Sequence, residues 1–206
     1  AVTETLQMVL VTMVLAGIFG LIIGTLLYTT RSGSILANRP VNALLNFLVN
    51  LIRPIPFVIL LAALSPVMLQ TIGTSIGIKA GIFAMVVAAT FAISRIVEQN
   101  LVSIDPGVIE AARAMGASKL RIMFSVMLPE ALGPLILGYT FIVIGVVDMS
   151  AMAGAVGGGG IGDFAIRYGY QRFDWNVTLV AIIIIVILVQ LVQLVGNLLA
   201  RKIMRR

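Results

Sequence analysis

The stretch VTLVAIIIIVILVQLVQLVGNLLA, residues 177–200, contains no charged side chain and decides the fold class. A helix needs about 20 mostly apolar residues to cross the hydrocarbon core of a bilayer, and this stretch meets that requirement. It belongs to a chain of 206 residues that is 60% apolar and 11% charged. Soluble domains are roughly half apolar and a quarter charged. We therefore predict an all-α integral membrane protein.

Four further apolar stretches, bounded by charges, prolines and glycines, are also long enough to span. The five predicted spans are residues 6–29, 44–69, 80–97, 131–149 and 177–200. We see no internal repeat and predict a single transmembrane domain over residues 1–206. Because five helices enclose a pathway poorly, we expect a homodimer with the pathway between its subunits. Gly20 with Gly24, and Gly77 with Gly81, have the four-residue spacing that permits close helix contact.

The positions of Lys and Arg predict the orientation, because both residues collect in cytoplasmic loops. The predicted cytoplasmic set is Arg31, Arg39, Arg53, Arg95, Arg113, Lys119, Arg121, Arg201, Lys202, Arg205 and Arg206. The predicted external set is Lys79, Arg167 and Arg172. This arrangement puts the N-terminus outside and the C-terminus in the cytoplasm. The net charge of +6 lies on no visible soluble domain, so we expect no nucleic-acid partner. We also expect no cleavable signal peptide.

The sequence lacks the residues that metal sites, nucleophilic catalysis and nucleotide binding usually require. The chain has no Cys and no His, which removes the common metal ligands and nucleophiles, so we predict no metal site and no catalytic residue. It has no Gly-rich loop ending in Gly-Lys-Ser/Thr, so ATP hydrolysis must belong to another polypeptide. Gly157, Gly159 and Gly162 have dinucleotide-binding spacing, but they follow a predicted span rather than a strand. A tight helix exit or re-entrant turn explains these glycines better.

The long predicted cytoplasmic segment, residues 103–129, has the capping residues of two short helices. Asp105 suits an N-cap, and Pro106 suits the first helical position. Gly116 suits the left-handed residue that ends the first helix, and Ser118 suits the cap of the second. Pro129 marks the next start, that of the fourth span. The predicted product is a rigid knob, which either docks a partner or lies on the membrane surface as an amphipathic helix.

The residues of this segment resemble the EAA signature of binding-protein-dependent ATP-binding-cassette (ABC) importer permeases. The match comprises Glu110-Ala111-Ala112, Gly116 and Leu128-Pro129, with Val126 where isoleucine is usual in the family. The resemblance implies a type I ABC importer transmembrane domain in the bacterial inner membrane. It also implies a pair of ATPase subunits that bind ATP and Mg²⁺, and an external substrate-binding protein or lipoprotein. The residues that it assigns to ATPase coupling are Glu110, Ala111, Ala112, Ala114, Met115 and Gly116.

Two other segments extend the resemblance over nearly the whole chain. Residues 53–57, Arg-Pro-Ile-Pro-Phe, are similar to a segment of permeases for amino acids. Residues 150–163, with residues 165–173 after them, resemble the methionine-uptake permeases. The prediction that the substrate is methionine, in the L and also the D form, rests on this resemblance alone. Another amino acid or a small polar solute carried by the same importer class is the alternative.

Asp148 is the most informative single residue, because a carboxylate within a membrane costs about 2.5–3.5 kcal/mol on insertion scales. We hypothesise that Asp148, with Met149, Ser150 and Met152, faces the pathway and attracts the ammonium group of an amino acid. The alternative is a solvated carboxylate at the outer interface. The segment 163–175 supplies Arg167, Tyr168, Tyr170, Arg172 and Phe173, which suit either a binding-protein contact or interfacial anchoring.

Three polar residues in the spans have alternative explanations. Arg53 either snorkels to the inner headgroups, with Pro54 and Pro56 setting the helix entry, or marks a functional break. Gln190 and Gln193 either bond between helices or line a wet cavity. Two rivals to an ABC permease remain at this stage. An ion-coupled secondary transporter would need more buried ionisable groups, and a membrane scaffold would not need the glycine segment.

Overall fold

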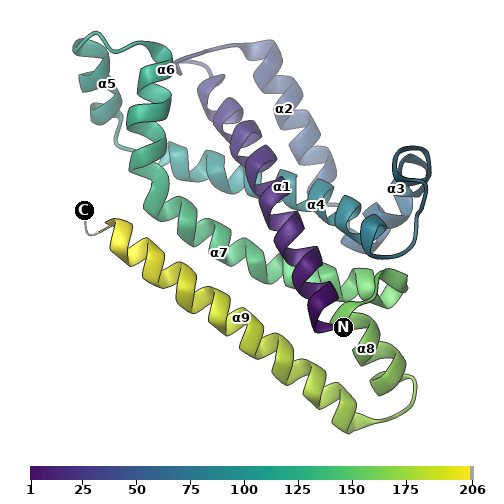
Figure 1. Ribbon diagram of the computed structural model, residues 1–206. Coiled ribbons are helices and arrows are strands. Elements are labelled where there is room, and N and C mark those ends of the chain that lie inside the picture. Colours follow the sequence, from purple (N-terminus) through teal and green to yellow (C-terminus); the bar gives the residue numbers. More distant parts are fainter. Residues whose placement is uncertain (205–206) are drawn as a thin grey trace.

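The computed structural model describes residues 1–204, in which all regular structure is helical. Arg205 and Arg206 of the predicted basic tail lie outside the described residues. The α-helices shown in Figure 1 are α1 (Val2–Thr29), α2 (Arg39–Ile52), α3 (Phe57–Ile72), α4 (Ile78–Val102), α5 (Pro106–Ala114), α6 (Lys119–Ile122), α7 (Leu128–Ala153), α8 (Gly160–Phe164) and α9 (Trp175–Met204). Three wider helical turns join them, η1 (Met123–Met127), η2 (Gly154–Gly158) and η3 (Ala165–Tyr170).

Four of the five predicted spans are confirmed as long apolar helices. They are α1, α4, the helical run Lys119–Gly158 and α9. Each begins before its predicted start, and all but α1 also end beyond the predicted end, because residues in the first and last turns adopt helical backbone outside the apolar stretch. The run Lys119–Gly158 spans 40 residues, because α6, η1, α7 and η2 follow one another, and its backbone leaves helical geometry at Val156 and Gly157.

The second predicted span, residues 44–69, is wrong as one continuous helix. The chain forms α2 and α3, which meet at a bend of 113°. Pro54 and Pro56 have no N–H to donate to the carbonyls four residues earlier, so the helical ladder stops there. Pro56 then precedes α3 and sets a helix entry, but this entry lies at a break inside the second predicted span, as the alternative interpretation of Arg53 supposed. Arg53 lies exposed at the bend.

Helix α4 lies at the centre of the fold, and α1 packs directly along it. A Cβ atom on Gly24 would come within 2.5 Å of Ser94 O, and one on Gly20 within 2.5 Å of Ile93 Cγ2. These two glycines therefore bring the backbones of α1 and α4 together, as predicted. Gly81 lies close to Ala153, whereas Gly77 has open space around it, so that predicted pair contributes through Gly81 alone.

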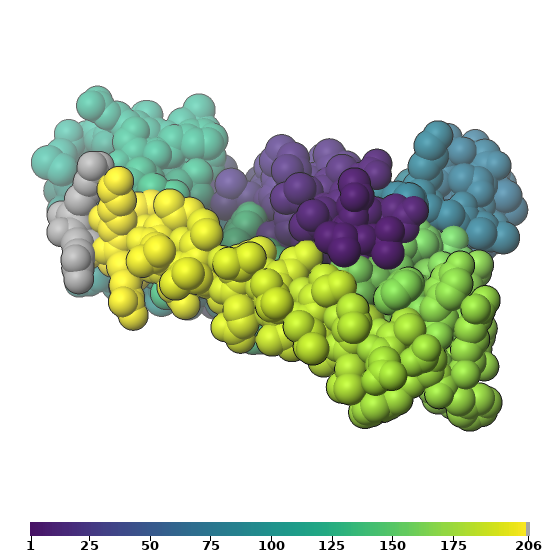
Figure 2. Space-filling model, turned by 60° about the horizontal axis from the view of Figure 1, so that its bottom comes forward, coloured from purple at the N-terminus to yellow at the C-terminus, as the bar shows by residue number. Residues whose placement is uncertain are grey.

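Helix α9 lies at the edge of the fold against α7, and Figure 2 shows it as a ridge along one face. Only 11% of its most apolar window is buried, so the rest of the chain leaves most side chains of α9 uncovered. Gln190 is exposed and Gln193 half-buried. Neither glutamine side chain makes a hydrogen bond within residues 1–204, so the predicted interhelical bonds do not occur inside one chain.

The two ends of the molecule separate most residues of the two predicted basic sets, whereas Arg53 lies at the bend between α2 and α3, a full 14-residue helix away from the connection that follows α1. Helix α5, the connection from α1 to α2 and the C-terminal end of α9 lie toward one end in Figure 1. The N-terminus, α8 and the start of α9 lie toward the other end. The grouping agrees with the predicted orientation, in which the α5 end is cytoplasmic. We call the two ends the inner and the outer end.

Replacing Gly24 with alanine tests the helix contact. The added methyl group has to displace the backbone of α4, and we expect the free energy of unfolding to fall by about 1–3 kcal/mol. Thermal unfolding of the purified protein in detergent, followed by circular dichroism, measures the change. Gly145→Ala in α7 is the matched control, because its Cβ would meet no atom within 4 Å. An equal loss in both variants would contradict the assigned contact.

Candidate functional site

The inner helix α5 begins as its capping residues predict. Asp105 Oδ1 accepts a hydrogen bond from Gly107 N at 2.8 Å, and Pro106 occupies the first helical position. Pro106 suits this position because its missing N–H would have no partner inside the helix. The start of α5 is therefore fixed by local chemistry.

The end of α5 is a closed left-handed turn at Gly116. This residue has φ +76°, and Gly116 N donates to Arg113 O at 2.9 Å. Ala117 N donates to Ala112 O at 3.1 Å, which completes the paired Schellman arrangement of a helix C-terminus. Since a left-handed backbone is costly for residues that carry a Cβ, Gly116 sets the bend as predicted.

Helix α5 buries one face and exposes the other. Ile109 and Ala112 are only 8% and 4% exposed and join the core. Successive helix residues are rotated by about 100°, so Ala112 cannot share a face with Ala111. The other residues assigned to coupling are exposed and form what we call the α5 tip: Glu110, Ala111, Ala114, Met115 and Gly116. Ala112 instead anchors the tip to the core.

The second predicted short helix is the inner end of the longest helix in the chain. Ser118 Oγ accepts a hydrogen bond from Arg121 N at 3.4 Å, as its predicted role as a cap requires. Pro129 lies in the first turn of α7, but the helical backbone already begins at Lys119, so it does not start a new helix. The α5 tip is therefore joined through residues 117–118 to a helix that reaches the outer end.

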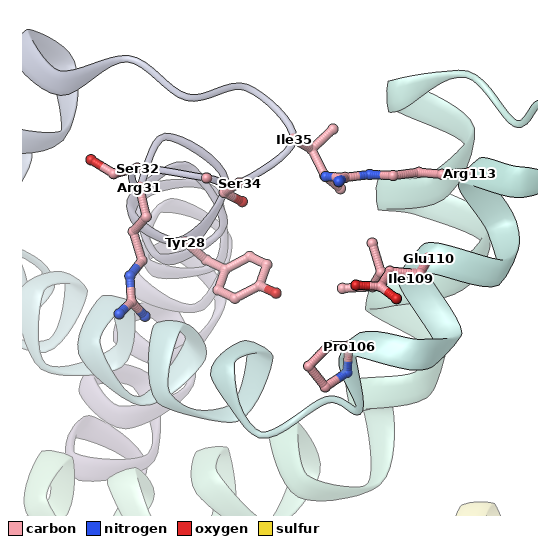
Figure 3. Close-up of a pocket in the computed structure, with 10 residues that line it drawn as sticks. Tyr28, Arg31, Ser32, Ser34, Ile35, Pro106, Ile109, Glu110 and Arg113 are labelled. Atoms are coloured by element: carbon pink, nitrogen blue, oxygen red, sulfur yellow. The ribbon is translucent and has the colours of Figure 1, made fainter.

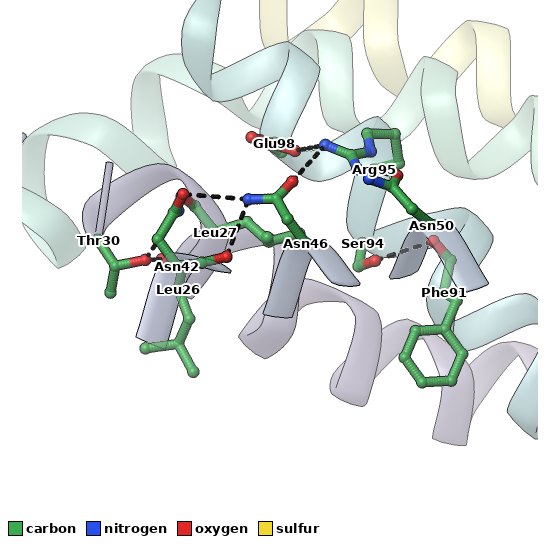
Figure 4. Close-up of polar contacts among 10 residues, drawn as sticks. All are labelled: Leu26, Leu27, Thr30, Asn42, Asn46, Asn50, Phe91, Ser94, Arg95 and Glu98. Carbon is green, nitrogen blue, oxygen red and sulfur yellow. Dashed lines mark hydrogen bonds and ion pairs between the residues drawn. The ribbon is translucent and has the colours of Figure 1, made fainter. Parts of the chain in front are cut away.

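A ladder of polar side chains fastens α2 to α4 near the inner end (Figure 4). Arg95 Nη1 donates to Glu98 Oε2 at 2.6 Å and to Asn46 Oδ1 at 3.2 Å, while Arg95 Nη2 donates to Asn50 Oδ1 at 2.7 Å. Asn42 Nδ2 donates to Leu27 O of α1 at 2.8 Å. We call these residues the asparagine seam. Sequence reasoning missed it, although asparagines at positions 42, 46 and 50 on one apolar helix were a usable signal.

The pair Arg95 and Glu98 within the seam is largely shielded, with side chains 17% and 9% exposed. Both charges already have close partners, so the pair costs less to keep in the membrane than either charge alone. A pair engaged in this way holds helices together and is a poor candidate for carrying an ion.

The four candidate pathway residues do not share one face. Ser150 is 1% exposed and donates from Oγ to Val147 O at 2.7 Å, so it faces the protein interior. Asp148 and Met152 are exposed on the same side of α7, one helical turn apart. Met149 lies half-buried between these faces. The open side of α7 continues through Gly145 and Phe141, which is 69% exposed.

The glycine segment is a tight helix exit, as predicted. Gly157, Gly159 and Gly160 have φ of +98°, +76° and +82°, which reverse the chain after α7. The turn is held by the start of α1, where Glu4 Oε2 accepts from Gly160 N at 2.7 Å and Thr5 Oγ1 accepts from Ile161 N at 2.8 Å. The Glu4 carboxylate also lies at the N-terminus of α8, where the helix dipole favours a negative charge. Sequence reasoning missed Glu4 and Thr5, since nothing local pairs them with residues 156 positions away.

The predicted external loop, residues 163–175, is mostly helical, because α8 and η3 occupy it up to Tyr170. Arg167 Nε pairs with Asp163 Oδ1 at 2.6 Å, and the Arg172 guanidinium lies 4.8 Å from the centre of the Tyr168 ring. These contacts order the segment and leave Tyr170 and Phe173 exposed. Phe173 is 94% exposed and has φ 55°, a conformation that non-glycine residues rarely adopt.

An apolar groove on the outside of the helices is unsuitable for a polar solute. It occupies about 770 Å³ between α1, α7 and α9. Its polar groups are already engaged, since Tyr139 donates to Gly17 O at 2.7 Å and Thr140 donates to Ile136 O at 2.7 Å. Among residues 1–204, no group of three or more His, Cys, Asp or Glu side chains is placed to hold a metal ion.

Comparison with known proteins identifies the relatives of this chain. The family described as binding-protein-dependent transport system inner membrane component matches residues 16–205. The probable D-methionine transport system permease protein MetI of Vibrio cholerae is 38% identical over 203 residues, covering 98% of this chain and 90% of that protein. The methionine import system permease protein MetP of Bacillus subtilis is 39% identical over 181 residues, covering 88% and 82%.

A solved structure has the same fold. It is an inward-facing conformation of the MetNI methionine ABC transporter. One of its chains is 42% identical to this chain, with a TM-score of 0.94, and the match covers 97% of this chain and 93% of the other. The similarity therefore includes the inner helices, the glycine turn and the outer segment.

Removing the Glu4 carboxylate tests how the glycine turn is held. In Glu4→Ala the N–H of Gly160 loses its acceptor, and we expect a local loss of about 1 kcal/mol, as for other helix caps. Hydrogen exchange should become faster in residues 154–170 and stay unchanged in α5. Glu4→Gln is the matched control, because its amide oxygen still accepts the bond. Unchanged exchange in Glu4→Ala would contradict the assigned role.

Proposed function

Because this chain belongs to the family of binding-protein-dependent transport system inner membrane components, we propose that it is the permease subunit of an ABC importer for methionine. It is a multi-pass protein of the bacterial cytoplasmic membrane. The methionine-transporting relatives favour this substrate over another amino acid or a small polar solute. The transmembrane domain is of the type I importer class.

The observation that carries the proposal is the attachment of the α5 tip. The tip is exposed, capped at both ends and joined to the helical run Lys119–Gly158, which carries Asp148 and ends at the glycine turn. We therefore expect a push on the tip to displace a residue of the candidate pathway. An amphipathic helix lying on the membrane needs no such connection, so the attachment favours docking.

The ATPase subunits hold the chemistry of the cycle, and this chain contributes none of it. Two copies of an ABC ATPase bind ATP and Mg²⁺, and each docks on the α5 tip of one permease. Their closing and opening shifts the permease pair between outward-open and inward-open states. This chain supplies a pathway and no covalent step.

The pathway runs between two copies of the chain. The exposed side of α7 bears Phe141, Gly145, Asp148 and Met152, and no other element within residues 1–204 covers it. When two such faces pack about a twofold axis, they enclose a route that is shielded from lipid. Asp148 then attracts the ammonium group of the substrate, and Met152 offers a polarizable apolar contact.

Substrate arrives from an external binding protein that contacts the outer end. The exposed aromatic side chains and arginines of residues 167–173 have the composition of protein interfaces. Phe173 supports this role, because a strained and almost fully exposed aromatic residue is costly for the free subunit.

The polar residues within the membrane helices do not support the rival hypothesis of an ion-coupled transporter. The ionisable pair shielded within the membrane helices, Arg95 and Glu98, is engaged in the asparagine seam rather than open to a pathway. Uptake by the purified dimer in vesicles, driven by an ion gradient without an ATPase, would support the rival.

Gly116→Leu tests the docking of the ATPase. A leucine at φ +76° strains the backbone by about 1–2 kcal/mol, so the end of α5 should unwind. We expect co-purification with the ATPase to be lost. Gly73→Leu is the matched control, because Gly73 has φ +74°, equal space around it and a place at the end of α3. Full ATPase binding and coupling in Gly116→Leu would count against the α5 tip as the docking site.

Asp148→Asn tests the pathway. Loss of the charge should reduce methionine uptake about tenfold, which corresponds to about 1.4 kcal/mol of lost attraction. Assembly with the ATPase should be normal, because Asp148 lies far along α7 from the inner end. Glu130→Gln, at the inner end of the same helix, is the control and should leave uptake unchanged. Normal uptake in Asp148→Asn would identify its carboxylate as merely solvated.

A further inference from the structure

A cavity of about 290 Å³ opens at the inner end beside α5, and Figure 3 shows its two walls. One wall is the connection between α1 and α2, residues 31–35, together with Tyr28 at the end of α1. The other wall is α5, through Pro106, Ile109, Glu110 and Arg113. We call this cavity the inner groove. It adjoins the α5 tip, because Glu110 belongs to both.

The groove is built into the fold rather than left by a loose loop. Ile35 and Ile109, one from each wall, are buried and belong to the same core cluster. The connection folds back on the end of α1, since Leu36 N donates to Thr29 O at 3.0 Å and Asn38 N donates to Thr30 O at 2.9 Å. Both walls therefore keep their positions without a ligand.

The charges around the groove have no partners of their own. Arg31, Glu110 and Arg113 are exposed, and none forms an ion pair or a side-chain hydrogen bond within residues 1–204. Figure 3 shows the Arg113 side chain extending across the groove toward Ile35, with the Glu110 carboxylate below it and the Tyr28 hydroxyl on the opposite wall. Two guanidinium groups against one carboxylate leave a positive balance.

We propose that the inner groove receives an acidic side chain from the ATPase subunit. Guanidinium groups bind carboxylates through paired hydrogen bonds. Arg113 extends across the groove, and Arg31 lines the other wall with its guanidinium directed away from α5. The apolar surfaces of Ile35 and Ile109 suit the methylene stem of such a side chain. The inference rests on the proposed function, and it extends the docking surface from α5 to the connection between α1 and α2.

Charge reversal on each of the two walls provides the sharpest test. Arg31→Glu and Arg113→Glu should each weaken ATPase binding at low salt by about tenfold, as expected for close interfacial charges. Glu110→Gln should tighten binding about threefold, because it removes the carboxylate that repels the guest. Lys79→Glu at the outer end is the control and should bind like wild type. The measurement is the dissociation constant of the purified permease and ATPase in zwitterionic detergent, at low and high salt.

Each outcome has a distinct meaning. Weaker binding by Glu110→Gln and tighter binding by Arg31→Glu would overturn the proposal, because the guest would then be a cation. An effect that appears only in nanodiscs containing anionic lipid would also overturn it and identify a lipid headgroup as the guest. If either reversal variant fails to fold, Arg31→Gln and Arg113→Gln test the same charge, with a smaller weakening expected.

The proposal and the proposed function fail differently. If the wild-type permease does not bind the ATPase at all, the proposed function is wrong. If wild type binds and both reversal variants bind equally well, the inner groove alone is wrong, and docking on the α5 tip stands.

Discussion

The close approach of α1 and α4 is the contact on which the other helices depend. Lipid tails are as apolar as leucine side chains, so membrane helices associate through packing and polar bonds rather than through the hydrophobic effect. Gly20 and Gly24 allow that packing by leaving no side chain between the two backbones. Helix α4 then provides the surface on which α2, α3 and α7 pack.

The asparagine seam solves a problem that the broken second span creates. Helix α2 is only 14 residues long and stops at a 113° bend, so it cannot hold its place as a full span would. Side-chain bonds to Arg95, and from Asn42 to the end of α1, hold α2 beside both neighbours. The same bonds steady the connection after α1, which forms one wall of the inner groove.

Features set by neighbouring residues could be predicted from the sequence, whereas features set by distant contacts could not. Four spans followed from apolar length, and the caps at Asp105, Gly116 and Ser118 followed from local hydrogen-bond needs. The inward face of Ala112 depends on what packs beneath α5. Glu4 and Thr5 accept bonds from residues 156 positions away, so no local pattern indicates them. The asparagine spacing in α2 indicated a polar stripe, but not that Arg95 of α4 would be its partner.

The bent helical run Lys119–Gly158 connects the inner end of the molecule to the glycine turn without a flexible linker. Pro134 lies inside α7, and the backbone leaves helical geometry at Val156 and Gly157. The 26 residues of α7 alone rise about 39 Å along their path, more than the roughly 30 Å of a hydrocarbon core. A helix of this kind acts as a lever, because a tilt of about 5° moves one end of a segment of about 30 Å by about 3 Å relative to the other. A small movement at the inner end therefore reaches the glycine turn as a movement of about one atomic diameter.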